Sequence, residues 1–157
     1  MPKIVLCLWF DDQAEEAASF YTSVFPNSRI TEVTRYPKGL TGEEGAVMTV
    51  SFLLDGQEYV ALNGGPHSTF TEAVSPQVHC PTQDEVDSYW AALSAGGEEG
   101  PCGWLKDRYG LSWQIVPTVL LELNADPDRD RAARAFQAML QMKRLDIAEL
   151  RRAADQA

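Results

Sequence analysis

The feature that most constrains the fold of this chain is an order of elements that occurs twice. Residues 4–62 open with an apolar strand, continue with a helical pattern and end in three strands. The last two of these strands flank Asp55-Gly56, a dipeptide typical of tight hairpins. Residues 74–118 repeat the order in a shorter form. The pattern predicts an α+β fold of tandem β-α-β-β-β units that share a core.

The boundaries of the units follow from changes in the hydrophobic pattern. We expect a first unit in residues 1–62, a connecting loop in 63–73, a second and shortened unit in 74–118, and a helical tail in 119–157, all within one compact domain. In the tail, Asp126-Pro127 is typical of a helix start. An apolar stripe follows, and we expect it to pack against the body or a second subunit. Its members are Ala132, Phe136, Met139 and Leu140.

The two predicted helices align the repeats with one another. Ser19-Phe20-Tyr21 in the first helix matches Ser88-Tyr89-Trp90 in the second, and the same offset places Leu6 opposite Ser75 in the opening strands. Because side chains alternate along a strand, every second residue from this pair onward should face one cavity. The predicted cavity residues are Leu6, Leu8 and Phe10 from the first unit and Ser75, Gln77 and His79 from the second. The intervening residues, Cys7, Trp9, Val78 and Cys80, should lie under the helices.

The last hairpin, residues 104–117, carries one polar amide among bulky apolar residues. Asp107 can accept hydrogen bonds from its own turn, and Gly110 can adopt the positive φ angle that closes a short bulged loop. On the strand that follows, Ser112 and Gln114 share a face, which we expect to be the cavity face. Gln114 could equally be a hydrogen-bonded residue of the sheet interior.

Composition and charge argue against several classes of partner. The chain has 157 residues and a formal net charge of −10, and the acidic excess lies before the tail, so its body should repel nucleic acids and anionic lipids. It has no apolar run of membrane-spanning length and no signal-peptide pattern, so we expect a cytoplasmic protein. Cys7, Cys80 and Cys102 lack the spacing of a zinc site or disulfide framework, and we expect them reduced and mostly buried.

Several separated motifs resemble one known family. They are Phe20-Tyr21, residues 62–67 (LNGGPH), residues 107–117 of the last hairpin, and residues 138–143 (AMLQMK). With the tandem units they resemble the vicinal oxygen chelate superfamily of glyoxalases, bleomycin resistance proteins and dioxygenases, and within it the PhnB-like or 3-demethylubiquinone-9 3-methyltransferase-like subgroup. The resemblance implies a glyoxalase-like fold, a curved mixed sheet with C-terminal helices. The glycine pairs of the chain do not fit an S-adenosylmethionine site, so the methyltransferase name implies no such activity here.

The resemblance also implies positions for a divalent metal. Carried over by position, the ligands fall on Leu6, Ser75 and Gln114, with a fourth near residues 61–63. None of these supplies the imidazole or carboxylate with which proteins hold Zn²⁺ or Fe²⁺. We therefore expect no metal and no other cofactor. A weakly held divalent metal that draws on a histidine remains an open alternative.

The leading hypothesis is a small-molecule binding protein of the glyoxalase/bleomycin-resistance type. The alternative is an enzyme of the same superfamily, a lyase, isomerase or dioxygenase, in which His79 acts as a base with Gln114 or a weakly held metal takes part. Each of three candidates also has a structural interpretation: His79 as a hydrogen-bonded structural residue, His67 as a surface residue and Trp104 as a core residue. The predicted ligand-binding residues are Asn63, His67, Ser75, Gln77, His79, Trp104 and Gln114.

Two expectations concern assembly. We expect a homodimer, because the edge strands of residues 29–54 need covering and the superfamily commonly pairs its units between or within chains. A third hypothesis is a scaffolding role through the amphipathic tail. It rests only on Phe136, Met139 and Leu140.

Overall fold

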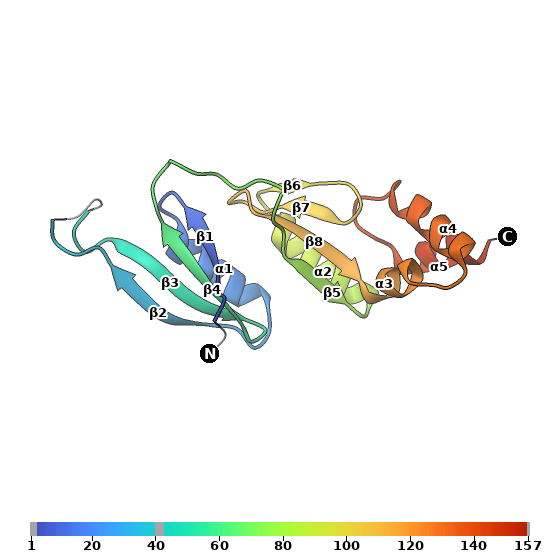
Figure 1. The fold of residues 1–157 in the computed structure, drawn as a ribbon, viewed down its shortest axis with the longest axis horizontal. Coiled ribbons are helices and arrows are strands. Elements are labelled where there is room, and N and C mark those ends of the chain that lie inside the picture. Colours follow the sequence, from blue (N-terminus) through green and yellow to red (C-terminus); the bar gives the residue numbers. More distant parts are fainter. Residues whose placement is uncertain (1–2, 40–42, 157) are drawn as a thin grey trace. The chain divides into compact units, whose positions relative to one another are not determined.

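The computed structural model describes residues 3–39 and 43–156, and the chain divides into two compact units, Met1–Phe70 and Thr71–Ala157. Each unit has its own four-stranded mixed sheet and a helix packed on it, and the second unit also includes the C-terminal helices (Figure 1). The predicted α+β class with tandem β-α-β-β-β units is confirmed. The expectation that the units form one compact domain stays a prediction.

The first unit is a mixed sheet with one helix. Its elements are β1 Leu6–Phe10, α1 Ala14–Val24, β2 Arg29–Arg35, β3 Val47–Leu54 and β4 Gln57–Asn63. The strand order is β1-β4-β3-β2, in which β1 runs parallel to β4 and the other neighbours are antiparallel. The turn between β3 and β4 has positive φ angles at Asp55 (47°) and Gly56 (80°), as a two-residue hairpin requires.

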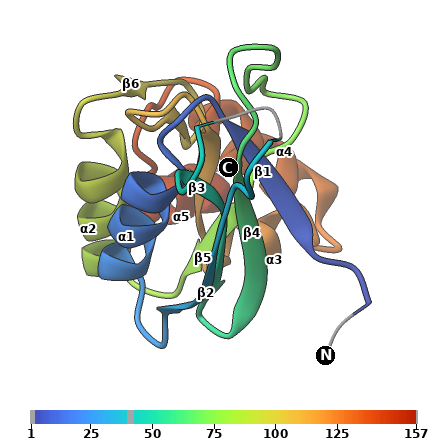
Figure 2. The same cartoon turned by 90° about the vertical axis from the view of Figure 1, so that its left-hand side faces the viewer.

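Helix α1 covers one face of the first sheet (Figure 2), and the strand register shows which residues lie beneath it. Tyr21 of α1 is fully buried against Phe52 of β3, and the ring of Phe52 stacks on Tyr59 of β4. Tyr59 is the register partner of Leu6 in β1. Because paired residues point to the same side of a sheet, Leu6 lies on the helix-covered face. The residues that alternate with it, Leu8 and Phe10, are buried on that face, whereas Leu6 at the start of the strand is exposed.

The predicted orientation of the first strand is therefore wrong. In each sheet we call the face opposite the covering helix the open face. In the first sheet it carries Cys7 and Trp9 in place of Leu6, Leu8 and Phe10. Three residues separate β1 from α1, whereas two separate β5 (Gln77–Cys80) from α2 (Gln83–Ser94). An alignment taken from the helices is thus one residue out of step in the strands, and such a shift moves every side chain to the other face. Cys7 is accordingly exposed, contrary to expectation, whereas Cys80 is buried.

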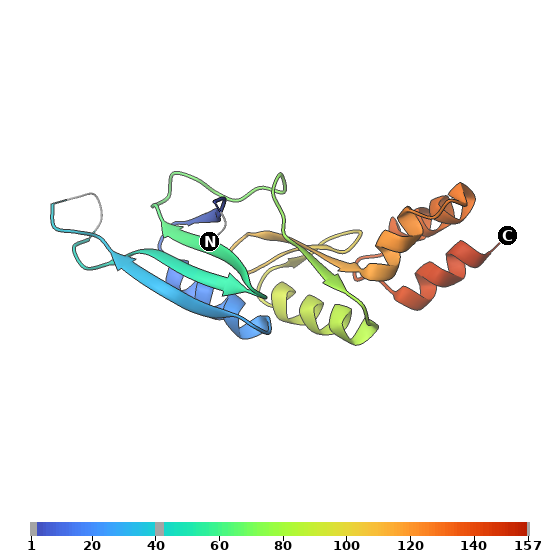
Figure 3. The same cartoon turned by 60° about the horizontal axis from the view of Figure 1, so that its bottom comes forward.

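The second unit repeats the topology with shorter strands. Its elements are β5, α2, β6 Glu98–Glu99, β7 Trp104–Lys106 and β8 Ser112–Pro117, in the order β5-β8-β7-β6. Helix α2 lies along one face of this sheet (Figure 3). The hydroxyl of Thr82 accepts a hydrogen bond from Glu85 N at 3.2 Å, so Thr82 caps the start of the helix.

The turn between β7 and β8 is organised by one buried carboxylate. Asp107 Oδ1 accepts hydrogen bonds from Tyr109 N at 2.8 Å and Leu111 N at 3.1 Å, and Oδ2 accepts from Trp113 Nε1 at 2.9 Å. Gly110 follows with a φ of 90°. The predicted turn role of Asp107 is therefore confirmed, and the side chain also fixes the buried Trp113 of β8.

The tail is part of the core of the second unit. Its helices are α3 Thr118–Asn124, α4 Arg129–Met139 and α5 Ile147–Asp155. Leu145 and Leu150 are fully buried in the cluster that these helices form with the end of β8. Gln83 of α2 donates to Leu145 O at 3.0 Å and accepts from Ile147 N at 2.8 Å. These contacts tie the tail to the helix that covers the sheet.

One detail of the predicted tail is wrong, and another is only partly tested. Asp128 caps α4, whereas Asp126 lies outside the helix and accepts a hydrogen bond from Asp128 N. In the predicted stripe, Ala132 is buried and Met139 packs on the core, whereas Phe136 and Leu140 are each 47% exposed, so their packing against a second subunit stays a prediction. Within residues 3–39 and 43–156, no helix is long and apolar enough to cross a membrane.

Candidate functional site

The open face of the second sheet carries most of the predicted ligand-binding residues. The register places Gln114 of β8 between Gln77 of β5 and Trp104 of β7. Ser112, two residues before Gln114, is paired with Lys106. Paired residues and alternate residues share a face, so these side chains lie on one side of the sheet.

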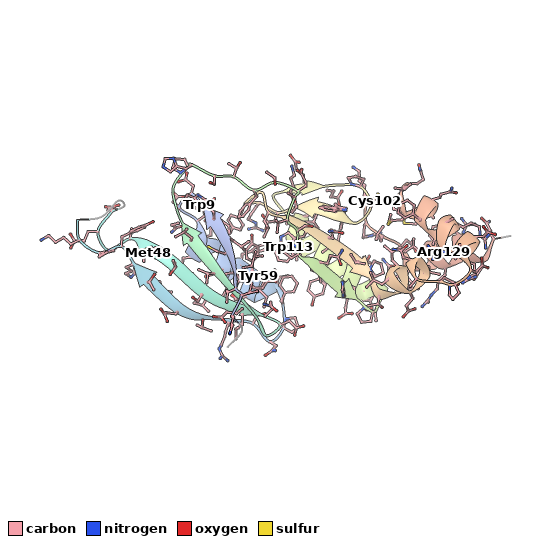
Figure 4. All side chains as sticks on the ribbon, viewed as in Figure 1. Trp9, Met48, Tyr59, Cys102, Trp113 and Arg129 are labelled. Carbon is pink, nitrogen blue, oxygen red and sulfur yellow. The ribbon has the colours of Figure 1, made fainter. Side chains whose placement is uncertain are left out.

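The other face of this sheet is the one that α2 covers. Trp90 of α2 donates from Nε1 to Glu99 Oε1 at 2.6 Å. Glu99 is the register partner of Leu105, which in turn pairs with Trp113, labelled in Figure 4. Leu105 and Trp113 are both buried. The polar residues of the open face therefore point away from α2.

Four side chains on the open face form one hydrogen-bonded chain, which we call the polar row: Ser75, Gln77, His79 and Gln114. Gln77 Nε2 donates to Gln114 Oε1 at 3.1 Å, and Gln114 Nε2 donates to Ser75 Oγ at 2.8 Å. His79 Nε2 lies 3.1 Å from Gln77 Oε1. An amide oxygen only accepts, so this contact places the proton of a neutral imidazole on Nε2 and leaves Nδ1 as the acceptor nitrogen.

The residues carried over to the metal positions do not fit a divalent metal. Leu6 has no donor atom, and it lies on the helix-covered face. Gln114 is neutral, and its oxygen already accepts from Gln77, while Ser75 accepts from Gln114. Zinc and iron sites in proteins use imidazole, thiolate or carboxylate ligands. The described part of the chain holds no cluster of three or more His, Cys, Asp or Glu residues arranged for a metal ion.

Asn63 and His67 lie in the first unit. Asn63 Oδ1 accepts from Ala14 N at 2.8 Å, and Nδ2 donates to Val47 O at 3.0 Å, so the amide joins the start of α1 to the sheet. His67 is exposed and lines, with Asn63, a hollow of about 560 Å³ whose rim includes Asp11 and Glu15. The predicted ligand-binding residues are therefore divided between the two units.

The loop after β4 is fixed by Trp9, which lies on the open face of the first sheet. Trp9, labelled in Figure 4, donates from Nε1 to Gly65 O at 2.9 Å. A Cβ atom on Gly64 would lie 2.3 Å from the indole ring of Trp9. Glycine is therefore required at residue 64, because the ring occupies the space of a side chain.

A pocket of about 530 Å³ lies on the second unit beside Trp104. Trp104, which the sequence placed either at a cavity mouth or in the core, is half-buried and lines this pocket. Lys106 Nζ lies 2.7 Å from Glu72 Oε1 at its edge. This hydrogen bond and charge lower the pKa of Glu72 and raise the pKa of Lys106. The other lining residues include Glu98, Cys102 and Ser112.

The pocket contains residues that the sequence reasoning missed. Lys106 alternates with Trp104 on β7, so alternation alone could have placed it on the same face. Glu72 lies in the loop before β5, and its ion pair joins segments far apart in sequence, for which the sequence carries no local signal. Alternation along the last strand placed Ser112 on the open face, but the sequence did not predict the burial and hydrogen bonding of its hydroxyl. Its Oγ is buried and has no hydrogen-bond partner among the residues that the structure describes.

Comparison with known proteins gives consistent results. A sequence profile of the 3-demethylubiquinone-9 3-methyltransferase family matches residues 2–116. A PhnB protein from Bacillus cereus, named for the same methyltransferase, is 37% identical, covers 74% of this chain and 99% of its own, and has a TM-score of 0.66. A structure from Pseudomonas aeruginosa is 17% identical over 74% of this chain and 98% of its own, with a TM-score of 0.62. The fosfomycin resistance protein FosX from Mesorhizobium loti is 13% identical, covers 80% of this chain and 100% of its own, and has a TM-score of 0.58. The last two likenesses concern the fold alone.

One curated sequence also matches. The cell wall acid trehalase of Arthroderma benhamiae is 29% identical over 93 residues, which are 59% of this chain. The match spans only 8% of the trehalase. The name of that much longer protein therefore assigns no activity to this chain.

Proposed function

The chain belongs to the 3-demethylubiquinone-9 3-methyltransferase-like family of the vicinal oxygen chelate superfamily, and from that premise we propose that it is a metal-independent small-molecule binding protein. Its ligand is an organic molecule held by hydrogen bonds and apolar contact. Coordination to a metal ion has no part in this proposal. The polar row and the wall around Trp104 form the binding surface.

The proposal depends mainly on the neutral charge and the hydrogen bonds of Gln114. The resemblance places a metal-binding glutamate at this position, and the chain has a neutral amide whose two ends are hydrogen bonded to Gln77 and Ser75. A primary amide has two N–H donors, so each glutamine of the row keeps a second donor for a ligand. Convergent polar groups beside an aromatic wall are typical of sites for small organic molecules.

Thermal-shift screening of the full chain, purified with chelator, tests the proposal. The compound set should include fosfomycin, because a protein of the same fold is named for resistance to it. Hits are then measured with Gln114→Ala and Gln77→Ala, and Gln57→Ala serves as the matched control because Gln57 is an exposed strand glutamine of the first unit. We expect ligands to raise the Tm of the wild type and the control, and to raise it less in the row variants.

Two outcomes would contradict metal-independent binding. Stabilisation by ligands only after addition of Zn²⁺, Fe²⁺ or Mn²⁺ would mean that the family's metal chemistry is retained. Substrate consumption by the wild type that His79→Ala abolishes would favour the enzyme, with His79 Nδ1 as the accepting nitrogen. Binding lost in the row variants, without turnover by the wild type, supports the proposal.

A further inference from the structure

The pocket of the second unit contains a buried hydroxyl for which the described part of the chain offers no partner. Ser112 is 1% exposed and lines the pocket, and its Oγ makes no hydrogen bond within the described residues. Buried polar groups are almost always hydrogen bonded, because leaving one unpaired costs free energy. A hydroxyl can both donate and accept, so Ser112 Oγ is suited to a polar group of a bound molecule.

The charges around this hydroxyl are unequal. The residues that line the pocket include Glu72, Glu98 and Lys106, and also Glu99, whose carboxylate lies on the face that α2 covers. Glu72 is paired with Lys106, and Glu99 accepts from Trp90. Glu98 is the register partner of Lys106 but lies outside its ion pair with Glu72. It is therefore the carboxylate of the pocket best placed to meet a ligand.

An anionic ligand fits this pocket poorly. It would have to take Lys106 from Glu72, and it would then face the carboxylates of Glu72 and Glu98 at close range. A cation meets Glu98 without breaking the existing pair. The overall charge of −10 adds to the attraction for cations during approach.

One wall of the pocket is an aromatic ring. Trp104 is half-buried, and it shares the open face with Ser112 and Lys106. Tryptophan offers the strongest cation–π surface among the side chains, and a flat ring stacks on it. The volume of about 530 Å³ falls within the usual range for drug-sized ligands.

We propose that this pocket binds a planar organic cation, an aromatic ring that carries a protonated amino group. The ring stacks on Trp104, the ammonium is attracted to Glu98, and a ligand N–H or hydroxyl bonds to Ser112 Oγ. This inference rests on the proposed binding function and names the chemical class of the ligand.

Three probes of nearly equal shape and different charge test the class: 2-naphthylmethylamine, 2-naphthylmethanol and 2-naphthoate. Isothermal titration calorimetry with the full chain at low ionic strength gives their Kd values. We expect the amine to bind about tenfold more tightly than the alcohol, since a charge-assisted contact is added, and naphthoate to bind most weakly. High salt should reduce the preference for the amine.

Substitutions of pocket residues test whether the probes bind in this pocket. Glu98→Gln should bring the amine within about twofold of the alcohol, because the charge-assisted contact is lost. Glu32→Gln, which removes an exposed strand carboxylate of the first unit, should leave the preference unchanged. Trp104→Leu should weaken the amine and the alcohol alike, as should Ser112→Ala. Circular dichroism confirms that each variant is folded.

Several results would overturn the cation proposal. They are naphthoate as the tightest probe, equal effects of Glu98→Gln and Glu32→Gln, amine binding unchanged by Trp104→Leu, or no binding of any probe up to millimolar concentration. None of these decides the binding function, which is judged by the separate ligand screen with the polar-row variants. Failure of that screen, with the amine still bound as expected, would instead refute the role of the polar row.

Discussion

The two units share one strand topology but have open faces of different chemistry. In the first unit, Cys7 of β1 is paired with Val60 of β4, and the next position on this face is Trp9. In the second unit the matching pair is Gln77 with Gln114. The backbone pairing is the same, so the difference lies wholly in the side chains. One scaffold thus supports a mainly apolar face in one copy and a hydrogen-bonded row in the other.

The units also differ in how their sheets are held together. β2 and β3 have seven and eight residues, whereas β6 and β7 have two and three. Short strands contribute few ladder hydrogen bonds. The second sheet is therefore supported by its turn at Asp107 and by the tail, to which Gly103 N is bonded through Lys143 O at 2.8 Å.

The largest expected effect is a difference in stability loss between substitutions at the two hairpin turns. Asp107→Ala removes a buried carboxylate that accepts three hydrogen bonds and should lower the free energy of unfolding by about 3 kcal/mol. Asp55→Ala, at the other turn, should cost about 1 kcal/mol, mainly because alanine disfavours the positive φ angle. Urea denaturation of both variants measures the difference.

A weaker variant makes this test more specific. Asp107→Asn keeps one acceptor oxygen and should fall between the wild type and Asp107→Ala. Equal losses for Asp107→Ala and Asp55→Ala would mean that the second unit does not depend more strongly on its turn.

The next effect concerns the first unit. Gly64→Ala would place a methyl group against the ring of Trp9, which is itself held by its bond to Gly65 O. We expect a loss of about 2 kcal/mol from overpacking. Replacing Trp9 by leucine in the same chain should recover part of it, as a double-mutant cycle would measure. An unchanged stability of Gly64→Ala would show that the loop after β4 yields without cost.

Local patterns in the sequence were sufficient for the elements and the turns. Asp107 and Asp55-Gly56 act through neighbours within a few residues, so each was predicted from its own segment. The face of Gln77 and His79 followed from alternation once their strand was identified. The orientation of β1 failed because it was taken from the helix, and the connecting segment is one residue longer in the first unit.

Contacts between distant segments were beyond the sequence. The bond between Gln77 and Gln114 depends on the register of two strands that no local pattern fixes. The pair of Glu72 with Lys106 depends on the path of a loop. The lack of a partner for the Ser112 hydroxyl among the described residues depends on everything packed around it. In the second unit the sequence thus predicted that Gln77, His79 and Gln114 share the open face, but not their partners.

A smaller effect tests whether the polar row could return to metal chemistry. Gln114→Glu keeps an acceptor for Gln77 Nε2, and Ser75 can donate to the new carboxylate, so stability should change by less than about 1 kcal/mol. One carboxylate beside serine and glutamine remains a poor ligand set. Plasma mass spectrometry should find no stoichiometric transition metal in this variant. Tight metal binding would show that a single side chain separates this open face from those of metal-dependent relatives.

The smallest effect is the pH dependence of the ion pair at the pocket of the second unit. The hydrogen bond from Lys106 lowers the pKa of Glu72, so the contribution of the pair is present above the ordinary glutamate pKa and is lost as pH falls through the lowered value. The same bond raises the pKa of Lys106, so the contribution is complete below the ordinary lysine pKa and is lost as pH rises through the raised value. Stability should therefore show no change from this pair around neutral pH.

Carboxyl NMR titration of Glu72 should show its lowered pKa moving upward in Lys106→Met and, more weakly, at high salt, because both groups are exposed to solvent. A pKa that Lys106→Met leaves unchanged would mean that the pair does not persist in solution, and Lys106 would then be free to bind an anion in the pocket.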